Sequence, residues 1–249
     1  MHTKLTRTAP ARYLKAYSVF RLAALLLWAA LPAALQARQQ PYLPPGRPDS
    51  ATLLAPPPLP GSAEQAADLA EVIAVHDACA SNETAVAFSE KKFSVFNLMP
   101  AVGEFFDADT LPKTETFFHR VQKEAAVVAD AGKDYWQRPR PFTVEPKLAV
   151  GKLEKSFGYP SGHAAEGMTL ALVLAEVFPE KRDAILAIGR NLGWHRVCIG
   201  RHYLTDIYAG RVLAQAVVRE LKASPAFQKD LAEVKAEMAA ALAAVRKLK

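Results

Sequence analysis

The chain has 249 residues, of which 51% are apolar and 22% are charged, with 12 glycines, 18 prolines and 2 cysteines. This composition excludes a disordered chain, a collagen-like fibre and a disulfide-dense miniprotein, and it allows one core of roughly 200 residues. The formal net charge is +6, but residues 1–37 hold five of the basic residues and no Asp or Glu, so the rest of the chain has a net charge of only +1. We therefore expect no basic surface that binds nucleic acid.

The N-terminal segment, residues 1–37, has the pattern of a secretory signal peptide. Its basic residues precede an uninterrupted apolar run from Leu22 to Leu31, and small residues follow up to Ala37. The run is shorter than the about 20 apolar residues that a membrane-spanning helix needs. We predict cleavage near Ala37 and a periplasmic or secreted mature protein without a membrane span. An uncleaved N-terminal membrane anchor is the alternative.

Residues 38–61 are rich in proline and include Pro44-Pro45 and Pro56-Pro57-Pro58. Proline fixes the backbone φ angle and has no N–H donor, so such a stretch does not join a helix or the middle of a sheet. We therefore predict an extended N-terminal arm that is not an element of the core.

From Ser62 onward the apolar residues recur at helical spacing, so residues 62–249 are predicted to form one all-α domain, a helical bundle. Ser62 and Gln65 have the pattern of a capping box ahead of a helix that runs towards Cys79. Patterns typical of strands and hairpins are missing from the sequence. Further helices are predicted near residues 117–133, 161–177, 184–192, 207–217 and 224–248.

The two cysteines, Cys79 and Cys198, allow two interpretations. In an oxidising compartment they could form one disulfide, but pairing depends on a distance that the sequence does not give. Two buried free thiols are the alternative. A zinc or cysteine-nucleophile site is not expected, because no partner residues stand at ligand spacing.

His202 and Asp206 are the first candidates for catalysis. They are four residues apart, so on a helix they would share a face. A carboxylate that accepts one ring N–H fixes the tautomer and leaves the other nitrogen free to act as a nucleophile or base. Taken alone, such a pair is more often a solvated surface contact.

Ser161, Gly162 and His163 open a predicted apolar helix. Unpaired backbone N–H groups at a helix N-terminus bind anions, and glycine allows a close approach. His163 could donate a proton to a leaving group. The alternative is a plain helix start in which serine is the cap and the histidine is structural.

Lys133, Arg140 and Arg196 are candidate phosphate ligands. A guanidinium matches two phosphate oxygens at once, and a lysine acts as a point charge. The alternative for each is a solvated surface cation. Pro139 and Pro141 argue against that for Arg140, because they stiffen the backbone that aims its side chain.

In chain order these residues read K-x6-R-P, P-S-G-H and R-x5-H-x3-D. The pattern resembles the phosphatase motif of the type 2 phosphatidic acid phosphatase (PAP2)/vanadium haloperoxidase superfamily. Together with Tyr42-Leu-Pro-Pro45, Pro48-Asp-Ser50 and the prolines after Leu54, it resembles more narrowly the bacterial class A non-specific acid phosphatases. This resemblance covers essentially the whole mature chain, and it implies an all-helical fold of the PAP2/haloperoxidase type over residues 62–249.

The resemblance also implies a mechanism. His202 would attack phosphorus to form a phosphohistidine, Asp206 would orient His202, and His163 would protonate the leaving group and then activate water. A protonated His163 beside a neutral nucleophile would explain an acidic pH optimum. No metal ion or other cofactor is expected, because the cations already neutralise charge. The implied phosphate-binding residues are Lys133, Arg140, Ser161, Gly162 and Arg196, with Ser161 and Gly162 acting through their backbone N–H groups.

The implied function is an exported acid phosphatase that hydrolyses small phosphate monoesters with broad specificity. Phosphotransfer to alcohols as a side activity and a homodimer or higher homo-oligomer are further expectations. The alternatives are a lipid phosphatase of the same superfamily, a vanadium haloperoxidase, and an exported phosphate-binding protein without turnover. The last would need the cations but neither His163 nor Asp206.

Two features depart from the family, and the place of four aromatic residues is open. The family usually has Ser where this chain has His195, which is either neutral packing or an added donor near the phosphate. The stretch between Pro141 and Pro160 is short and lacks the cysteine of many relatives. Four aromatic residues are either pocket wall or core: Tyr135, Trp136, Phe157 and Tyr159.

Overall fold

The computed structural model describes residues 41–247, so the predicted signal peptide and its cleavage near Ala37 lie outside the described residues. Contacts divide the chain into two units, Met1–Pro41 and Tyr42–Lys249. Every helix of the described part lies in the second unit, which also holds all candidate site residues.

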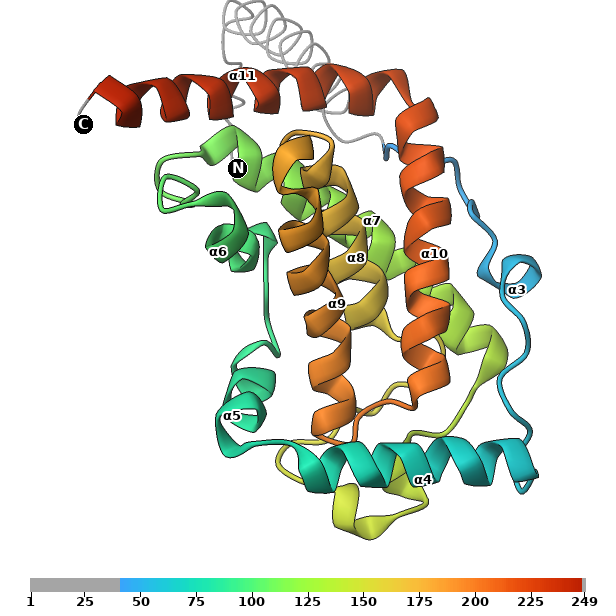
Figure 1. Ribbon diagram of the computed structural model, residues 1–249. Helices are drawn as coiled ribbons and strands as arrows, with labels where there is room; N and C mark the ends of the chain where they lie inside the picture. Colours follow the sequence, from blue (N-terminus) through green and yellow to red (C-terminus); the bar gives the residue numbers. More distant parts are fainter. Residues whose placement is uncertain (1–40, 248–249) are drawn as a thin grey trace, which may run out of the picture. The chain divides into compact units, whose positions relative to one another are not determined.

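Residues 41–247 contain helices and no strand, which confirms the all-α prediction for this part of the chain. Short 3-10 turns occur at Val95–Leu98, Pro141–Thr143, Pro146–Leu148 and Pro179–Lys181. The α-helices, labelled in Figure 1 where there is room, are α3 Ser50–Leu53, α4 Ala63–Ala78, α5 Ser81–Ser89, α6 Met99–Val102, α7 Pro112–Trp136, α8 Gly162–Ala175, α9 Arg182–Cys198, α10 Leu204–Ala223 and α11 Pro225–Lys247.

Helix α8 is the centre of the bundle. It packs against α7, α9 and α10 (Figure 1), and nearly all of its side chains are buried. A helix that is apolar on every side is stable only in such a position. At its N-terminal end α10 comes very close, because a Cβ on Gly210 would lie only 2.6 Å from the carbonyl oxygen of Ser161. The start of α8 is therefore held tightly by its neighbours.

The same end of the bundle is covered by α4. Figure 1 shows α4 lying across the region where α9 ends and α10 begins, and α4 contacts both of these helices. Helix α11 packs on α7 and α10 at the opposite end. The C-termini of α7 and α9 and the N-termini of α8 and α10 thus lie at one end of the bundle.

The long helices that apolar spacing predicts are present with boundaries a few residues from those expected, and Ser62 caps α4 by accepting the N–H of Gln65 at 3.1 Å. The capping box is one-sided, because the Ser62 N–H donates to the Leu59 carbonyl oxygen instead. Helix α5 was not predicted, since its nine residues are too few to display a clear apolar stripe.

The proline-rich arm differs from its prediction. Tyr42, Leu43 and Leu54 are buried in the core, and the backbone N–H groups of Tyr42 and Leu43 each donate to the Glu124 carboxylate at 2.7 Å. Between them lies the short helix α3. The arm therefore contributes these three side chains to the core, because apolar side chains between the prolines can be buried even where proline prevents a long helix.

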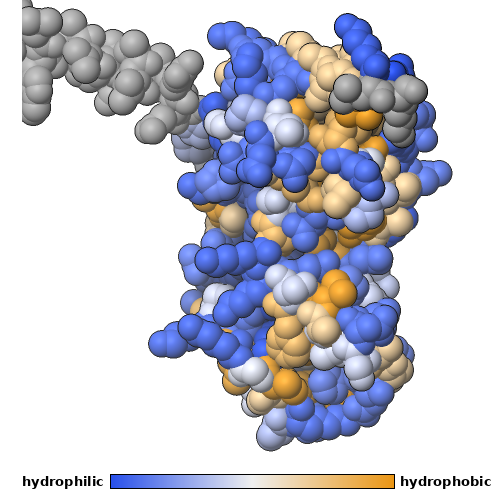
Figure 2. Space-filling model, turned by 90° about the vertical axis from the view of Figure 1, so that its left-hand side faces the viewer, coloured by the Kyte–Doolittle hydropathy of each residue, from blue (hydrophilic) through white to orange (hydrophobic). Residues whose placement is uncertain are grey.

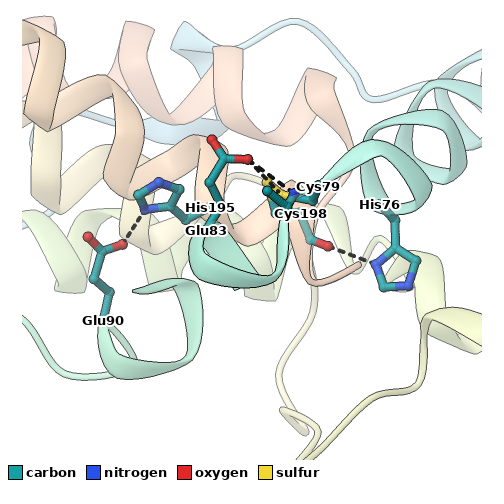
Figure 3. The surroundings of a disulfide bond; sticks show 7 residues. His76, Cys79, Glu83, Glu90, His195 and Cys198 are labelled. Atoms are coloured by element: carbon teal, nitrogen blue, oxygen red, sulfur yellow. Dashed lines mark hydrogen bonds and ion pairs between the residues drawn. A yellow bond between two sulfur atoms is a disulfide. The ribbon is translucent and has the colours of Figure 1, made fainter. Parts of the chain in front are cut away.

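Cys79 and Cys198 form a disulfide with their Cα atoms 5.7 Å apart (Figure 3). This settles the question that the sequence left open. The bond joins the end of α4 to the end of α9 across a sequence separation of 119. The carboxylate of Glu83 lies close to both sulfur atoms, but the disulfide uses both thiols, so this group offers no thiolate to a metal ion.

In the described part of the chain, the helices are too short or too polar to span a bilayer. On the face that Figure 2 shows, hydrophobic residues lie in separate patches between hydrophilic ones.

We expect the double variant Cys79→Ser/Cys198→Ser to be less stable than the native chain by about 5 kcal/mol, because the disulfide restricts a long loop in the unfolded state. Urea unfolding with and without a reducing agent would measure this. Reduction should lower the stability of the native chain to that of the variant and leave the variant unchanged. Equal stability of both oxidised proteins would contradict the expectation.

Candidate active site

The three groups of candidate residues meet at the covered end of the bundle. Lys133 lies in the last turn of α7, and its Nζ atom is 3.1 Å from the place that a Cβ on Gly162 would take. The ammonium group therefore sits directly beside the N-terminus of α8, where a side chain at position 162 would have to displace it slightly. Its Nζ also donates to Asp130 at 2.7 Å, on the solvent side.

His202 lies between a carboxylate and a guanidinium. Its Nδ1 is 3.2 Å from Asp206 Oδ2, and its Nε2 is 3.0 Å from Arg140 Nη1. Because a guanidinium only donates, Nε2 must accept, and the ring proton must be on Nδ1, directed to Asp206. Burial lowers the pKa of His202 well below 6.5, and Arg140 and Arg196 lower it further. The ring is thus neutral, with a lone pair on Nε2.

The contact between His202 and Asp206 has a different origin from the expected shared helix face. Helix α10 begins only at Leu204, so His202 precedes it. Asp206 lies in the first turn, where its Oδ2 also accepts the N–H of Tyr203 at 3.0 Å. A helix-capping carboxylate therefore reaches back to the histidine, which explains why the spacing of four still brings the two together.

Asp206 is itself held by Arg138, which the sequence analysis did not single out. Arg138 donates from Nη1 to Asp206 Oδ1 at 2.6 Å and from Nη2 to Asp68 Oδ2 at 2.8 Å. Its guanidinium also stacks on the Tyr203 ring, 3.8 Å from the centroid. Burial raises the pKa of Asp206, and the charge of Arg138 opposes that rise. Two features of the sequence could have pointed to this contact. The acidic Asp68 stands among the apolar positions of α4, and Arg138 is a further cation beside Lys133 and Arg140.

Arg140 is buried and tied to the backbone on two sides. Its Nε donates to the Ser156 carbonyl at 2.7 Å, and its Nη1 donates to the Arg201 carbonyl at 2.9 Å as well as facing His202. These bonds fix the guanidinium beside the Nε2 atom of the histidine. Arg140 is therefore not a solvated surface cation, as the flanking prolines indicated.

Arg196, in the last turn of α9, is also buried, and it forms an ion pair that the sequence analysis missed. Its Nη2 donates to Glu154 at 2.5 Å, and Glu154 lies 2.9 Å from the Nε of buried Arg201. Burial lowers the pKa of Arg196 to about 10, so it stays charged at neutral pH. Its own Nε meets no acceptor among residues 41–247, which leaves a donor for an anion.

The N-terminus of α8 corrects one expectation. Ser161 caps the helix by accepting the N–H of Ala164 at 3.3 Å, but its own N–H donates to the Asp206 carbonyl at 3.0 Å and is not available to phosphate. Within the described residues, the N–H groups of Gly162 and His163 donate to no acceptor. The pair of free helix donors is therefore Gly162 and His163 in place of Ser161 and Gly162.

His163 packs against Phe93, and its Nε2 lies 3.3 Å from the carbonyl oxygen of Glu90. A carbonyl only accepts, so Nε2 carries the proton and Nδ1 has the lone pair. Burial lowers the pKa of His163 to about 3, with Arg196 and His202 adding to the effect. Burial and the surrounding cations therefore oppose the protonated state of His163 that the sequence analysis expects.

The structure also shows where His195 and three of the four aromatic residues lie. His195 Nδ1 lies 2.6 Å from the Glu90 carboxylate (Figure 3), so this residue makes a buried polar contact with the end of α5. Tyr159 is core, since it is buried and its hydroxyl donates to the Ala55 carbonyl at 2.6 Å. Tyr135 and Phe157 are exposed.

Residues 124–228 match the family model of the PAP2 superfamily. The chain is similar to a non-specific acid phosphatase of Providencia stuartii, with 37% identity over 148 residues that cover 54% of this chain and 60% of the relative. It is 36% identical to a non-specific acid phosphatase of Salmonella typhimurium over 146 residues, 56% of this chain and 58% of the relative. An acid phosphatase of Zymomonas mobilis is 28% identical over 199 residues, 76% of this chain and 75% of the relative.

The matches to the Providencia and Salmonella proteins thus span less than two thirds of the length of these relatives. Among solved structures, the chain is similar to the first transmembrane PAP2 type phosphatidylglycerolphosphate phosphatase from Bacillus subtilis, with 19% identity and a TM-score of 0.47. That alignment covers 70% of this chain and 89% of the other.

The lowered pKa of His163 predicts how stability depends on pH. Because the folded-state pKa of about 3 lies below the unfolded value of about 6.5, the unfolded chain takes up a proton that the folded chain does not. Stability should be fully present above pH 6.5 and fall as the pH drops towards 3, by up to about 1.4 kcal/mol per pH unit for this residue.

Urea unfolding of the native chain and of His163→Asn between pH 7 and 4 would measure this. The variant should lose less stability over that range. Saturating inorganic phosphate should reduce the loss in the native chain, since a bound anion favours the imidazolium. Parallel pH curves for the two proteins would contradict the lowered pKa.

Proposed function

We propose that the chain, whose residues 124–228 match the family model of the PAP2 superfamily, is an acid phosphatase that hydrolyses phosphate monoesters through a phosphohistidine at His202. The observation that carries the proposal is the state of His202. Its ring is neutral, its Nδ1 proton is directed to Asp206, and its Nε2 lone pair lies beside the Arg140 guanidinium. A nucleophile needs that lone pair, and a phosphate needs that cation.

Phosphate binding is supported by the positive charge around His202. Lys133, Arg140 and Arg196 converge there, and the free N–H groups of Gly162 and His163 add donors at a helix N-terminus. Cations and dipoles that are fixed before the substrate arrives stabilise the charge spread over the phosphoryl oxygens in the transition state. They supply the charge neutralisation for which other phosphatases use a metal ion, so we propose metal-independent catalysis.

In the first step, His202 Nε2 forms a bond to phosphorus while the ester P–O bond breaks. The proton on Nδ1 stays on the side of Asp206, which stabilises the positive charge that develops on the ring. In the second step a water oxygen attacks phosphorus, the P–N bond breaks, and inorganic phosphate leaves. An alcohol in place of water would give the proposed phosphotransferase side activity.

His163 is the proposed acid for the leaving oxygen and base for water. Because burial lowers the pKa of His163 to about 3, the proposal has its proton arrive with the substrate. A bound phosphate dianion offsets the cations that lower the pKa of His163, and a monoester below its second pKa of about 6 brings a proton of its own. Both effects favour turnover on the acid side of neutrality.

We also propose that the chain is exported to the periplasm or secreted, after cleavage near Ala37, and acts on small monoesters as a homodimer or higher homo-oligomer. The cationic start, the apolar run from Leu22 to Leu31 and the disulfide between Cys79 and Cys198 support export. Structural disulfides persist in oxidising compartments.

Release of p-nitrophenol from p-nitrophenyl phosphate between pH 4 and 9, with and without EDTA, tests the proposal. We expect acid-side turnover that survives EDTA and falls by roughly a thousandfold or more in His202→Ala, because the nucleophile is lost. His119→Ala, which removes an exposed histidine of α7, is the matched control and should keep full activity.

Three results would count against the proposal. Turnover that EDTA abolishes and a divalent ion restores would overturn metal independence. Equal turnover in His202→Ala would show that the nucleophile lies elsewhere. Binding of phosphate by the native chain without any turnover would favour a phosphate-binding protein.

A further inference from the structure

Glu90, the residue that ends α5, contacts two histidines of the bundle by two different groups. Its carboxylate Oε2 lies 2.6 Å from His195 Nδ1, and its backbone carbonyl oxygen lies 3.3 Å from His163 Nε2. Figure 3 shows the carboxylate of Glu90 and the ring of His195 facing each other. The residue is only 8% exposed, so both contacts are shielded from water.

The contact with His195 determines where Glu90 can lie. A buried carboxylate needs a donor, and among residues 41–247 the side-chain donor within hydrogen-bond distance of this one is His195. Without the His195 ring, the buried carboxylate would have no donor, so turning towards solvent would lower its free energy. Because the carbonyl oxygen that meets His163 belongs to the same residue, a movement of Glu90 would change that bond as well.

The contact with His163 determines which ring nitrogen faces the reaction. The carbonyl oxygen accepts the Nε2 proton, so Nδ1 is the atom that exchanges a proton with substrate or water. The same segment supplies Phe93, whose ring centroid lies 5.3 Å from that of His163. Glu90 and Phe93 thus hold the orientation and the tautomer of His163 from the α5 side.

We propose that Glu90 is a positioning residue for His163, that His195 holds Glu90 in place, and that the pair enables the chain to act on alkyl phosphates. This inference rests on the proposed function. An alkoxide leaves phosphorus only when a proton reaches it as the P–O bond breaks, and His163 Nδ1 gives that proton while Nε2 keeps its bond to Glu90. A nitrophenolate leaves without such help, so aryl esters depend less on the position of His163.

The test compares kcat/KM for p-nitrophenyl phosphate and for glycerol 2-phosphate, since kcat/KM covers the step in which the P–O bond breaks. In His195→Ala we expect the value for the alkyl ester to fall at least about tenfold more than that for the aryl ester, since general acid catalysis contributes 10²- to 10⁴-fold. This ratio does not depend on the fraction of folded enzyme, so a loss of stability alone would not change it.

Two further variants sharpen the test. His195→Asn keeps a side-chain N–H donor and should restore most of the ratio. Glu83→Gln changes an exposed carboxylate of the same helix, whose Oε2 accepts the Ala80 N–H at 3.4 Å, and should leave the ratio unchanged.

Equal losses on both esters in His195→Ala, or no loss on either, would overturn the positioning role and leave the proposed function standing. A native chain that hydrolyses neither ester would overturn the proposed function and this inference with it.

Discussion

The ion pair between Arg138 and Asp206 is the contact on which the geometry of the site depends. Arg138 is 3% exposed and Asp206 is fully buried, and together they connect Asp68 on α4 to His202 ahead of α10. Removing one member of a buried pair leaves an uncompensated charge, at a cost of about 3–5 kcal/mol. The pair holds the Asp206 carboxylate that faces His202 Nδ1, and the second bond of Arg138, to Asp68, ties α4 to the same place.

Around that pair, the fold keeps like charges close together and keeps the histidines neutral. Helix ends bring Lys133 and Arg196 to the pocket, and bonds to backbone carbonyls fix Arg140. Burial lowers the pKa values of His163 and His202, and the nearby cations lower them further because they repel an imidazolium. The proposed phosphate would offset these positive charges, which the fold holds in place before an anion arrives.

Much of this could be predicted from the sequence, because the long helices follow from apolar periodicity and the motif residues stand at fixed local spacing. Arg138 escaped notice because its partner Asp68 is 70 residues away, and the Glu90–His195 contact spans 105 residues. Spacing along the chain carries no information on such distant pairs. Likewise, the bond from the Ser161 N–H to the Asp206 carbonyl depends on how α10 packs against α8.

The proposed attack of His202 Nε2 on phosphorus would leave a phosphate on that residue, and trapping this covalent intermediate is the sharpest test. The native chain would be mixed with p-nitrophenyl phosphate, quenched in alkali, in which a phosphorus–nitrogen bond survives, and mapped by tryptic peptide mass spectrometry. Trypsin cleaves after Arg201, so His202 begins its own peptide, separate from that of His163. We expect phosphate on the His202 peptide alone. Phosphate on the His163 peptide, or turnover without any phosphoenzyme, would contradict it.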